Sequence, residues 1–375
     1  MKTYTVGLIG FGFIGKVHAL CHTNMPWFYD PCPVRTVFHS VCTSRDATAA
    51  KAAQFLGESV IPCTDYREIT ENPEIDIVDI ASPNDCHLEA LLSAMAHQKH
   101  IYCEKPLTGN LSEAILIQNA LKGYHGISQI TLQYRFLPAI LRAKQIMDDG
   151  LLGDIHEFRA DFLHAGSAKP ETVIQPWKLK GGVLADLGSH VLDLMNFLLD
   201  DSPDEVSAVC HTPYPVRSDG KGGQIPVPTE DSVMALIRLK NRACGMVSAT
   251  KIATGSEDEL RFEINGSKGA IRFNGMNPNQ LFYYDNTQSD RPFGALKGWT
   301  AIDCGQRYEK PAGFPSAKSP MGWLRAHQHC LYHFLTHVAE GNATHPDLAD
   351  AIRLEQIMDA VRQSAKENRT VKIQY

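Results

Sequence analysis

The sequence predicts an α/β protein in two parts: an N-terminal, doubly wound parallel sheet and a C-terminal α+β domain with a large, mostly antiparallel sheet. Up to about residue 125, short apolar runs alternate with helix-like segments, which is typical of a parallel sheet. From about Gly126, apolar runs follow one another with few helices between them, which favours antiparallel pairing. A chain of 375 residues is long enough for two domains. We place them at residues 1–125 and 126–375.

The N-terminal part opens with a glycine-rich turn. Residues 4–9 (YTVGLI) form an apolar, β-branched run, and a helix-like segment begins at Lys16. The sequence GFGFIG between them has the GxGxxG spacing, whose glycines permit a tight turn and the close approach of a pyrophosphate to a helix N-terminus. Strand, glycine turn and helix in this order predict a Rossmann dinucleotide-binding domain. We expect these residues of the turn to bind the cofactor: Gly10, Gly12, Phe13, Ile14 and Gly15.

The alternation continues along the first part. We expect strands at residues 34–42, 75–80 and 100–103, with helices at 47–56 and 87–96. Ligands of such sheets bind beyond the carboxyl ends of the strands. The segments that follow these strands supply the other expected cofactor-binding residues: Ser44, Arg45, Ser82, Asn84, His87, Glu104 and Lys105.

The end of the second strand bears on the choice between NAD and NADP. A carboxylate there holds the ribose hydroxyls of NAD, whereas an arginine accommodates the 2′-phosphate of NADP. This sequence has Ser44 and Arg45, followed by Asp46. The balance favours NADP slightly, and an arginine that only caps the loop would leave NAD as the cofactor.

The C-terminal part contains one segment with two different sides. Residues 181–199 (GGVLADLGSHVLDLMNFLL) predict a helix with a leucine- and valine-rich stripe, and Asp186, His190 and Asp193 lie opposite it. Asp186 and His190 are i, i+4 neighbours, so their side chains can reach a common ligand. Taken alone, the polar side is either a solvated face or a catalytic pair.

The remaining elements of the C-terminal part are expected to be mostly strands. Strands are predicted at 127–134, 154–163, 205–211, 232–239, 243–251, 260–265, 270–273 and 281–284, and helices at 139–149, 324–340 and 348–367. The Pro/Gly-rich stretches 212–229 and 287–320 are too long for ordinary connections and are interpreted as lids or interface loops.

Four motifs together resemble the Gfo/Idh/MocA family of NAD(P)-dependent sugar and polyol oxidoreductases. They are GxGxxGxxH ending at His18, Pro83-Asn84-x-x-His87, Glu104-Lys105-Pro106, and Asp186-x-x-x-His190 after a glycine pair. The resemblance extends over nearly the whole chain. It implies hydride transfer between the nicotinamide and a secondary alcohol or ketone of a sugar, polyol or related small molecule. It also implies a homodimer or homotetramer in which a second subunit covers one face of the open sheet.

The resemblance implies site residues as well. Lys105, Asp186 and His190 match the family's catalytic lysine, acid and histidine. Imidazole titrates near neutral pH, so His190 is the expected base, while Lys105 would stabilise a developing alkoxide and Asp186 would orient the imidazole or bind a substrate hydroxyl. The expected substrate contacts are Tyr134, Arg135, Trp177, Asp186 and His190, with His164 and His327 as weaker candidates. The sequence departs from the family's pattern in two places. The segment 177–182 is shorter than the family's usual link, and Gln133 stands where asparagine is frequent. Both departures bear on the identity of the substrate more than on the reaction.

Two other functions use the same fold. A glycosidase or epimerase could oxidise its sugar transiently with a retained cofactor, and a dinucleotide-sensing regulator could lack catalysis altogether. A sensor has no need of a lysine, an aspartate and a histidine at these positions. The sequence therefore favours a dehydrogenase or reductase that acts on CH–OH groups.

Composition excludes several other classes. The chain is 43% hydrophobic and 21% charged with a net charge of −6, and it has no block of five lysines and arginines, so nucleic acid is not an expected partner. We expect neither a membrane span nor a signal peptide, hence a cytoplasmic protein. Ten cysteines without a CxxC pair are expected to be mostly small buried hydrophobes. His327, His329, Cys330 and His333 do not share one helix face, so no metal site is expected.

Overall fold

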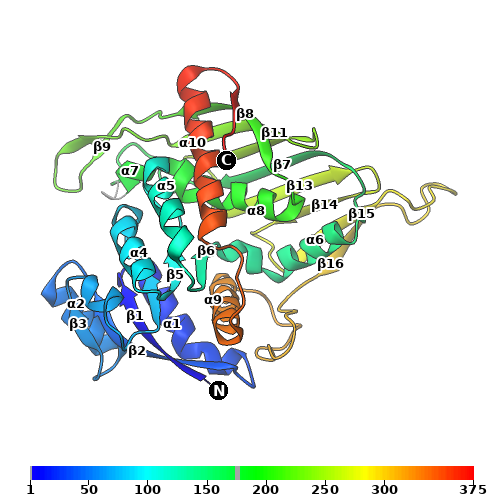
Figure 1. Cartoon of the computed structure of the whole chain (residues 1–375). Coiled ribbons are helices and arrows are strands. Elements are labelled where there is room, and N and C mark those ends of the chain that lie inside the picture. The colour runs from blue at the N-terminus through cyan, green and yellow to red at the C-terminus, as the bar shows by residue number, and fades with distance from the viewer. Residues whose placement is uncertain (1, 174–177) are drawn as a thin grey trace. The chain divides into compact units, whose positions relative to one another are not determined.

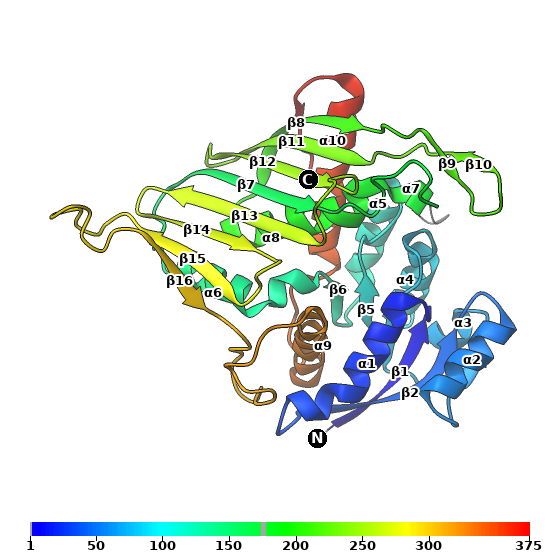
Figure 2. The ribbon, with the colours of Figure 1, turned by 180° about the vertical axis from the view of Figure 1, so that it is seen from behind.

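The computed structural model describes residues 2–173 and 178–375, and these form two compact units (Figures 1 and 2). The first unit comprises Met1–Phe136, Tyr308–Ala317 and Gly322–Glu355. The second comprises Leu137–Arg307, Lys318–Met321 and Gln356–Tyr375. Both units are therefore assembled from segments that are distant in the sequence.

The first unit contains a six-stranded parallel sheet in the order β3-β2-β1-β4-β5-β6. Its strands are β1 (Lys2–Ile9), β2 (Val34–Cys42), β3 (Ile61–Cys63), β4 (Ile77–Ile80), β5 (His100–Glu104) and β6 (Ser128–Thr131). Its helices include α1 (Phe13–Phe28), α2 (Asp46–Leu56), α3 (Arg67–Thr70), α4 (His87–Ala96), α5 (Leu111–Ala120) and α9 (Trp323–Glu340). This strand order is that of the Rossmann fold, so the predicted doubly wound sheet is confirmed.

The strand predicted at residues 127–134 is shorter than expected. The strand β6 ends at Thr131, and Gln133–Phe136 form a 3-10 helix. Every residue from Ser128 to Phe136 is buried on all sides. The sequence of this segment, ISQITLQY, mixes polar and apolar residues without a sustained period, so it does not indicate where the strand ends and the helical turn begins.

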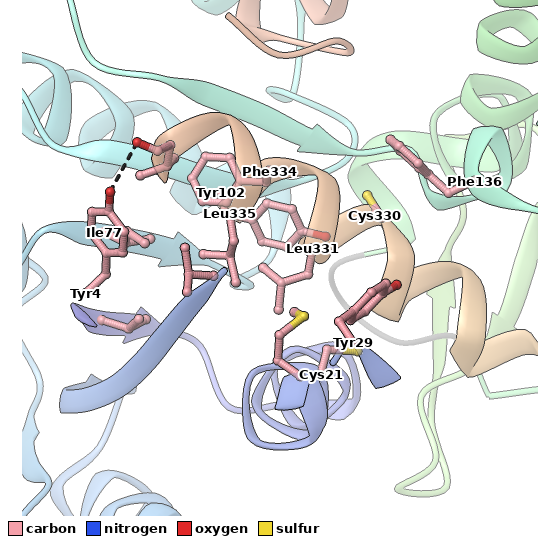
Figure 3. Packing of buried hydrophobic residues seen from close by; sticks show 14 of the residues in the cluster. Tyr4, Cys21, Tyr29, Ile77, Tyr102, Phe136, Cys330, Leu331, Phe334 and Leu335 are labelled. Atoms are coloured by element: carbon pink, nitrogen blue, oxygen red, sulfur yellow. Dashed lines mark hydrogen bonds between the residues drawn. The ribbon is translucent and has the colours of Figure 1, made fainter. Parts of the chain in front are cut away.

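The helix α9, close to the C-terminus, completes the core of the first unit. Its residues Leu331, Phe334 and Leu335 pack with Tyr4 and Tyr102 of the parallel sheet, and all are buried (Figure 3). The hydroxyl of Tyr4 donates to the carbonyl oxygen of Val338 at 3.1 Å. The predicted helix at 324–340 thus belongs to the core beneath the N-terminal strands.

The second unit contains a nine-stranded sheet in the order β16-β15-β14-β13-β7-β12-β11-β8-β17. All neighbouring strands are antiparallel except β7 and β12. The strands are β7 (Ile155–Leu163), β8 (Pro203–His211), β11 (Ser232–Leu239), β12 (Cys244–Thr250), β13 (Glu259–Gly266), β14 (Gly269–Asn274), β15 (Gln280–Asp285), β16 (Trp299–Asp303) and β17 (Val371–Lys372). The prediction of a large, mostly antiparallel sheet is confirmed.

The two long Pro/Gly-rich stretches contain strands that were not expected. Residues 212–229 include a hairpin of β9 (Val216–Ser218) and β10 (Gln224–Pro226), and residues 287–320 include the edge strand β16. The helices that complete the described chain are α6 (Pro138–Asp148), α7 (Lys178–Val183), α8 (Ser189–Leu199) and α10 (Leu348–Glu367). The helix α8 packs on β7 and β12.

The predicted helix 181–199 is built from three pieces. The helix α7 is followed by a π-helical turn, Leu184–Gly188, and then by α8. The alternative of a solvated polar face does not hold for His190 and Asp193, because both are buried in the second unit. Residues Leu179–Leu199 are long and apolar enough to cross a membrane, contrary to the expectation for the sequence, but 72% of that stretch is buried. It is therefore a core helix of this unit.

Candidate active site

The glycine turn leaves a gap above the N-terminus of α1. Gly10 has a φ of 97°, and a Cβ atom there would lie 2.6 Å from the backbone of Ala81. A Cβ on Gly15 would lie 2.3 Å from the carbonyl oxygen of Gly10. A Cβ on Gly12, in contrast, would meet nothing within 4 Å. Within the described residues no side chain caps this helix, so the turn and the first N–H groups of α1 fit the pyrophosphate of a dinucleotide.

The residues that follow β2 are open to a ligand. Ser44, Arg45 and Asp46 are all exposed, and Arg45 is the N-cap residue of α2. In the part of the chain that the structure describes, the Arg45 guanidinium has no salt-bridge partner. The side chain is therefore available at the position where a Rossmann domain meets the adenosine ribose.

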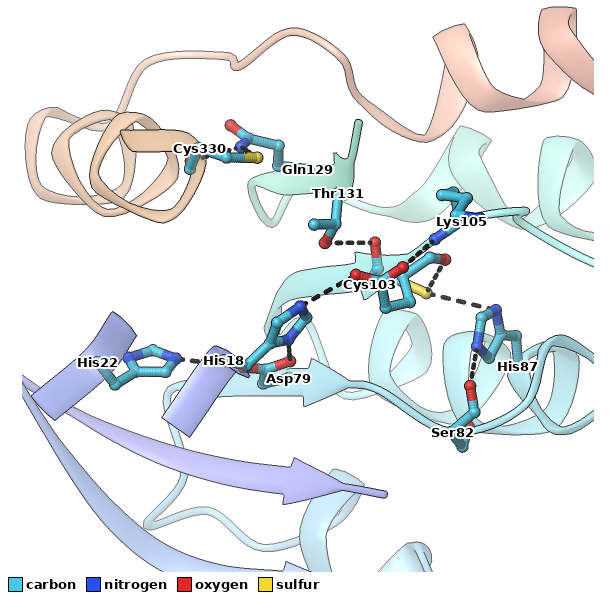
Figure 4. A network of polar contacts seen from close by, with 11 residues as sticks. His18, His22, Asp79, Ser82, His87, Cys103, Lys105, Gln129, Thr131 and Cys330 are labelled. Atoms are coloured by element: carbon cyan, nitrogen blue, oxygen red, sulfur yellow. Dashed lines mark hydrogen bonds and ion pairs between the residues drawn. The ribbon is translucent and has the colours of Figure 1, made fainter. Parts of the chain in front are cut away.

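His87 joins the loops that follow β4 and β5. Its Nε2 lies 2.9 Å from the carbonyl oxygen of Ser82 (Figure 4). Its Nδ1 lies 3.2 Å from the carbonyl oxygens of Pro106 and Leu107. The Asn84 side chain also donates to the Thr108 carbonyl oxygen, at 3.2 Å. Burial lowers the pKa of His87, and the carbonyl contacts oppose this only in part. Its Nδ1 also lies 3.7 Å from the Cys103 thiol, which can donate to it, so His87 is a buried connector whose ring can stay uncharged.

Glu104 and Lys105 lie at the carboxyl end of β5. The Glu104 carboxylate accepts from the backbone N–H of Lys105 at 3.2 Å, and its other oxygen lies 3.1 Å from Nε2 of His18. Glu104 is buried, whereas Lys105 is partly exposed. The strand β5, the Glu104 carboxylate and the loop held by His87 together fix the position of the Lys105 main chain.

A chain of polar contacts extends from Glu104 into the unit. His18 Nδ1 lies 2.7 Å from one oxygen of Asp79, and His22 Nε2 lies 3.2 Å from the other (Figure 4). Sequence reasoning included His18 in a family motif but overlooked Asp79. The available signal was an acid inside the apolar run IDIVDI, because a buried carboxylate needs a charged or hydrogen-bonding partner.

His327 of α9 lies beside this chain. Both of its ring nitrogens are buried and have no hydrogen-bond partner among the described residues. One of them lies within 4.8 Å of ligand atoms of His18 and Glu104, a spacing that a metal ion could bridge. Burial holds the pKa of His327 well below its usual range, and the positive charges of His18 and Lys105 lower it further. His327 is therefore neutral.

The other members of the histidine and cysteine group on α9 have separate partners. His329 Nδ1 lies 2.8 Å from the Tyr29 hydroxyl, and His333 Nδ1 lies 2.8 Å from the Gln129 side-chain oxygen. The Gln129 amide donates to the carbonyl oxygen of Cys330 at 2.7 Å. Within the described part of the chain, His327, His329, Cys330 and His333 do not form a group that could share one metal ion.

Asp186 and His190 belong to the second unit. Asp186 is partly exposed in the π-helical turn, and the buried His190 ring lies 6.0 Å from that of Phe162. Glu230 fixes the start of this turn, because its carboxylate accepts from the Leu184 N–H at 2.9 Å. Gly182 has a φ of 66°, and a Cβ there would lie 2.2 Å from the Glu230 carboxylate. Nothing in the sequence had singled out Glu230.

The expected substrate contacts are divided between the units. Tyr134 and Arg135 lie in the 3-10 helix of the first unit and are mostly buried, at 8% exposure each. His164 follows β7 in the second unit, where its Nδ1 accepts from the Gly166 N–H at 2.7 Å. Trp177 lies outside the described residues.

A six-stranded sheet in the Rossmann order, with an open glycine turn before its first helix, is the architecture of a dinucleotide-binding protein. A family model described as "Oxidoreductase family, NAD-binding Rossmann fold" matches residues 4–131, and one described as "GFO/IDH/MocA C-terminal domain" matches residues 140–272. The chain belongs to the Gfo/Idh/MocA family, which confirms the resemblance inferred from its motifs. It is therefore an NAD(P)-dependent oxidoreductase that acts on CH–OH groups.

Several relatives match most of the chain. Levoglucosan dehydrogenase of Pseudarthrobacter phenanthrenivorans is 32% identical over 97% of both chains. Inositol 2-dehydrogenase of Acidothermus cellulolyticus is 29% identical, over 72% of both. Among solved structures, a levoglucosan dehydrogenase in complex with NADH and L-sorbose has a TM-score of 0.93 and 32% identity, with both chains covered in full. An oxidoreductase domain protein from Kribbella flavida has a TM-score of 0.92 and 30% identity, also over both whole chains.

Proposed function

We propose that this enzyme interconverts a secondary alcohol and a ketone on a cyclic sugar or polyol, with Lys105, Asp186 and His190 as the catalytic residues. The observation that carries the proposal is the position of Lys105, which directly follows a buried glutamate at the carboxyl edge of the sheet. Similarity to levoglucosan and inositol dehydrogenases supports a ring-shaped substrate with several hydroxyl groups. Tyr134, Arg135 and Trp177 are the proposed further substrate contacts.

Each proposed catalytic residue has one task. The His190 imidazole accepts the proton of the reacting hydroxyl, and Lys105 stabilises the oxygen while it is negatively charged. Asp186 orients the imidazole or binds a neighbouring hydroxyl. Bound NAD(P) supplies the hydride acceptor. The glycine turn, Phe13 and Ile14 would hold its pyrophosphate, Ser44 and Arg45 its ribose, and the loops with Ser82, Asn84, His87 and Glu104 would surround its nicotinamide end.

The catalytic assignment predicts separate effects on turnover and on cofactor binding. Lys105→Ala and His190→Ala should each lower kcat by a factor of about 100 or more, while cofactor affinity survives. Steady-state rates with levoglucosan, L-sorbose and myo-inositol at 340 nm, beside fluorescence titration of the cofactor, measure both quantities. Lys51→Ala, which removes an exposed lysine of α2, is the matched control. Unchanged kcat in both active-site variants would contradict the assignment, and turnover without added cofactor would favour the transient-oxidation alternative.

We propose that Arg45 lets the enzyme take NADP. The guanidinium is exposed at the end of β2, and a 2′-phosphate would form a charge-assisted contact with it. Arg45→Ala should therefore lower kcat/KM for NADP by roughly tenfold and leave kcat/KM for NAD nearly unchanged. The relatives solved with NADH favour the alternative in which Asp46 holds the ribose of NAD. A wild-type enzyme that strongly prefers NAD, and keeps that preference without Arg45, would contradict the NADP assignment.

We further propose a division of labour and an assembly. Residues 1–125 bind the dinucleotide, and residues 126–375 bind the substrate and join subunits in a homodimer or homotetramer in the cytoplasm. Exposed apolar side chains on the sheet of the second unit support the assembly. Met234 pairs directly with Val209, and Leu236 with Met246, so these four residues form one apolar patch across three strands. A second copy of the chain would cover this patch.

A further inference from the structure

We propose that His18 is a positioning residue of the active site, because its ring bridges the buried carboxylates of Asp79 and Glu104 and so holds Glu104 against the backbone of Lys105. The inference rests on the proposed function of Lys105. His18 itself contacts neither the glycine turn nor the lysine side chain in the hydrogen bonds of the described residues. It would act through Glu104.

The geometry requires a doubly protonated ring. Nδ1 of His18 lies 2.7 Å from an Asp79 oxygen, and Nε2 lies 3.1 Å from a Glu104 oxygen. Carboxylates only accept hydrogen bonds, so both ring nitrogens must donate. All three side chains are buried. An imidazolium between two carboxylates supplies the paired charge that buried carboxylates need.

The groups around His18 favour this charge. His22 of α1 shares Asp79 with it, the Tyr102 ring of β5 lies 5.1 Å away, and His327 approaches from α9. Burial lowers the pKa of His18, but the charges and hydrogen bonds of Asp79 and Glu104 outweigh burial and raise it to about 10. His327 is neutral, and burial raises the pKa of Tyr102 well above its usual value. Of the three imidazoles, His18 alone bridges two carboxylates among the described residues.

The link to catalysis is the Glu104 carboxylate. One oxygen faces His18, and the other accepts from the N–H of Lys105. If His18 loses its charge, this carboxylate loses its charged partner, and the main chain at the lysine loses a fixed acceptor. A catalytic group that is displaced by even a small distance loses much of its rate advantage.

The neighbouring histidine is a matched control. His22 lies one turn further along α1 and contacts the other oxygen of Asp79, but in the described part of the chain it does not reach Glu104. Substitution at either histidine therefore disturbs the same buried aspartate. Only substitution at His18 disturbs the link to Lys105.

The experiment compares His18→Gln and His22→Gln, each in the wild type and in Lys105→Met. We expect His18→Gln to lower kcat about tenfold or more with cofactor affinity within about threefold of the wild type, and His22→Gln to keep kcat. In the Lys105→Met background, His18→Gln should cause no further loss of kcat, because it acts through the lysine. If His18 had only a structural role, the losses of kcat in His18→Gln and Lys105→Met would multiply in the double variant. His18→Gln and His22→Gln would then also lower kcat to a similar extent.

A second readout uses pH and does not depend on turnover. A raised pKa in the folded state stabilises the protein fully below the usual histidine pKa of 6.5, and the stabilisation disappears as the pH rises through about 10. The difference in Tm between wild type and His18→Gln should therefore shrink between pH 7 and pH 10. If His18→Gln fails to fold, Glu104→Gln replaces it and should lower kcat in the same way.

The outcomes separate this inference from the proposed function. Wild-type kcat in Lys105→Met would overturn the function proposed for the lysine. A large loss in Lys105→Met together with wild-type kcat in His18→Gln would overturn the positioning role alone. Mass spectrometry of metals in the purified enzyme tests the other use of His18, Glu104 and His327. If the wild type contains one metal ion per chain and His18→Gln loses it, these three side chains bind a metal, and the proposed imidazolium is wrong.

Discussion

Two glycines of one motif have different tasks at the residue scale. Gly10 has a left-handed backbone in contact with the Ala81 main chain, so the fold itself needs glycine there. Gly12 has an ordinary φ of −77° and open space where a side chain would lie, so the fold does not need it. This open space is where we propose that the pyrophosphate of the cofactor binds.

This difference predicts the behaviour of two variants. Gly12→Val should weaken cofactor binding about tenfold or more without lowering Tm, because its side chain would occupy the site of the pyrophosphate. Gly10→Ala should lower stability by about 1–3 kcal/mol, since it forces a left-handed residue against backbone atoms. Calorimetry and fluorescence titration of both proteins separate the two effects. Full cofactor affinity in Gly12→Val would mean that the glycine run is only a turn.

Single residues were predictable where a local motif carries them. The glycine turn and Glu104-Lys105-Pro106 were found because each has a fixed spacing next to a strand. Asp79 and Glu230 were missed because their partners are distant in the sequence: Asp79 contacts His18, and Glu230 contacts Leu184. Neither acid belongs to a periodic pattern, so only the folded chain connects them to the site.

At the scale of elements, the helical segment Leu179–Leu199 shows the limit of a regular projection. A projection at 100° per residue assumes an unbroken α-helix, and the π-helical turn at Leu184–Gly188 changes the direction of every later side chain. The sequence correctly indicated that Asp186 and His190 lie in one helical segment. It could not indicate the π turn, because the turn depends on Gly182 and on the distant Glu230.

The start of this segment supplies a prediction at the same scale. Gly182→Ala should lower the stability of the protein by about 1–3 kcal/mol, because it places a Cβ at positive φ and against the Glu230 carboxylate. It should also lower kcat, since Asp186 and His190 follow within the next turns. Thermal unfolding and steady-state rates measure the two effects. Gly298→Ala, at an exposed glycine with open space around it, should change neither; equal effects in both variants would argue against a special role for Gly182.

At the scale of the whole molecule, alternation and succession of apolar runs were enough to predict one parallel and one mostly antiparallel sheet. The parallel pairing of β7 with β12 was not predictable, because adjacency in the sheet depends on contacts between strands about 80 residues apart. The packing of α9 in the core of the first unit could not be predicted from the sequence either. Its sequence shows an amphipathic helix but not the sheet against which the helix packs.

The apolar patch of the second unit predicts the assembly state. Leu236→Glu places a charge at the centre of the patch made by Val209, Met234, Leu236 and Met246, and should convert the oligomer into monomers. Light scattering coupled to gel filtration gives the mass directly. Leu116→Glu, at another exposed apolar residue on α5, should leave the mass unchanged. A wild-type protein that is already monomeric at micromolar concentration would refute the proposed assembly.

The place of α9 in the first core also determines when that core can form during biosynthesis. The strands of the parallel sheet have all been synthesised once the ribosome passes Phe136, whereas Leu331, Phe334 and Leu335 are added about 200 residues later. At roughly 5–20 residues per second, the nascent chain carries the uncovered face of its first sheet for roughly 10–40 s. Tyr4 and Tyr102 lack their packing partners on α9 during that interval. The N-terminal unit of this enzyme is thus among the first parts to be made and among the last to be completed.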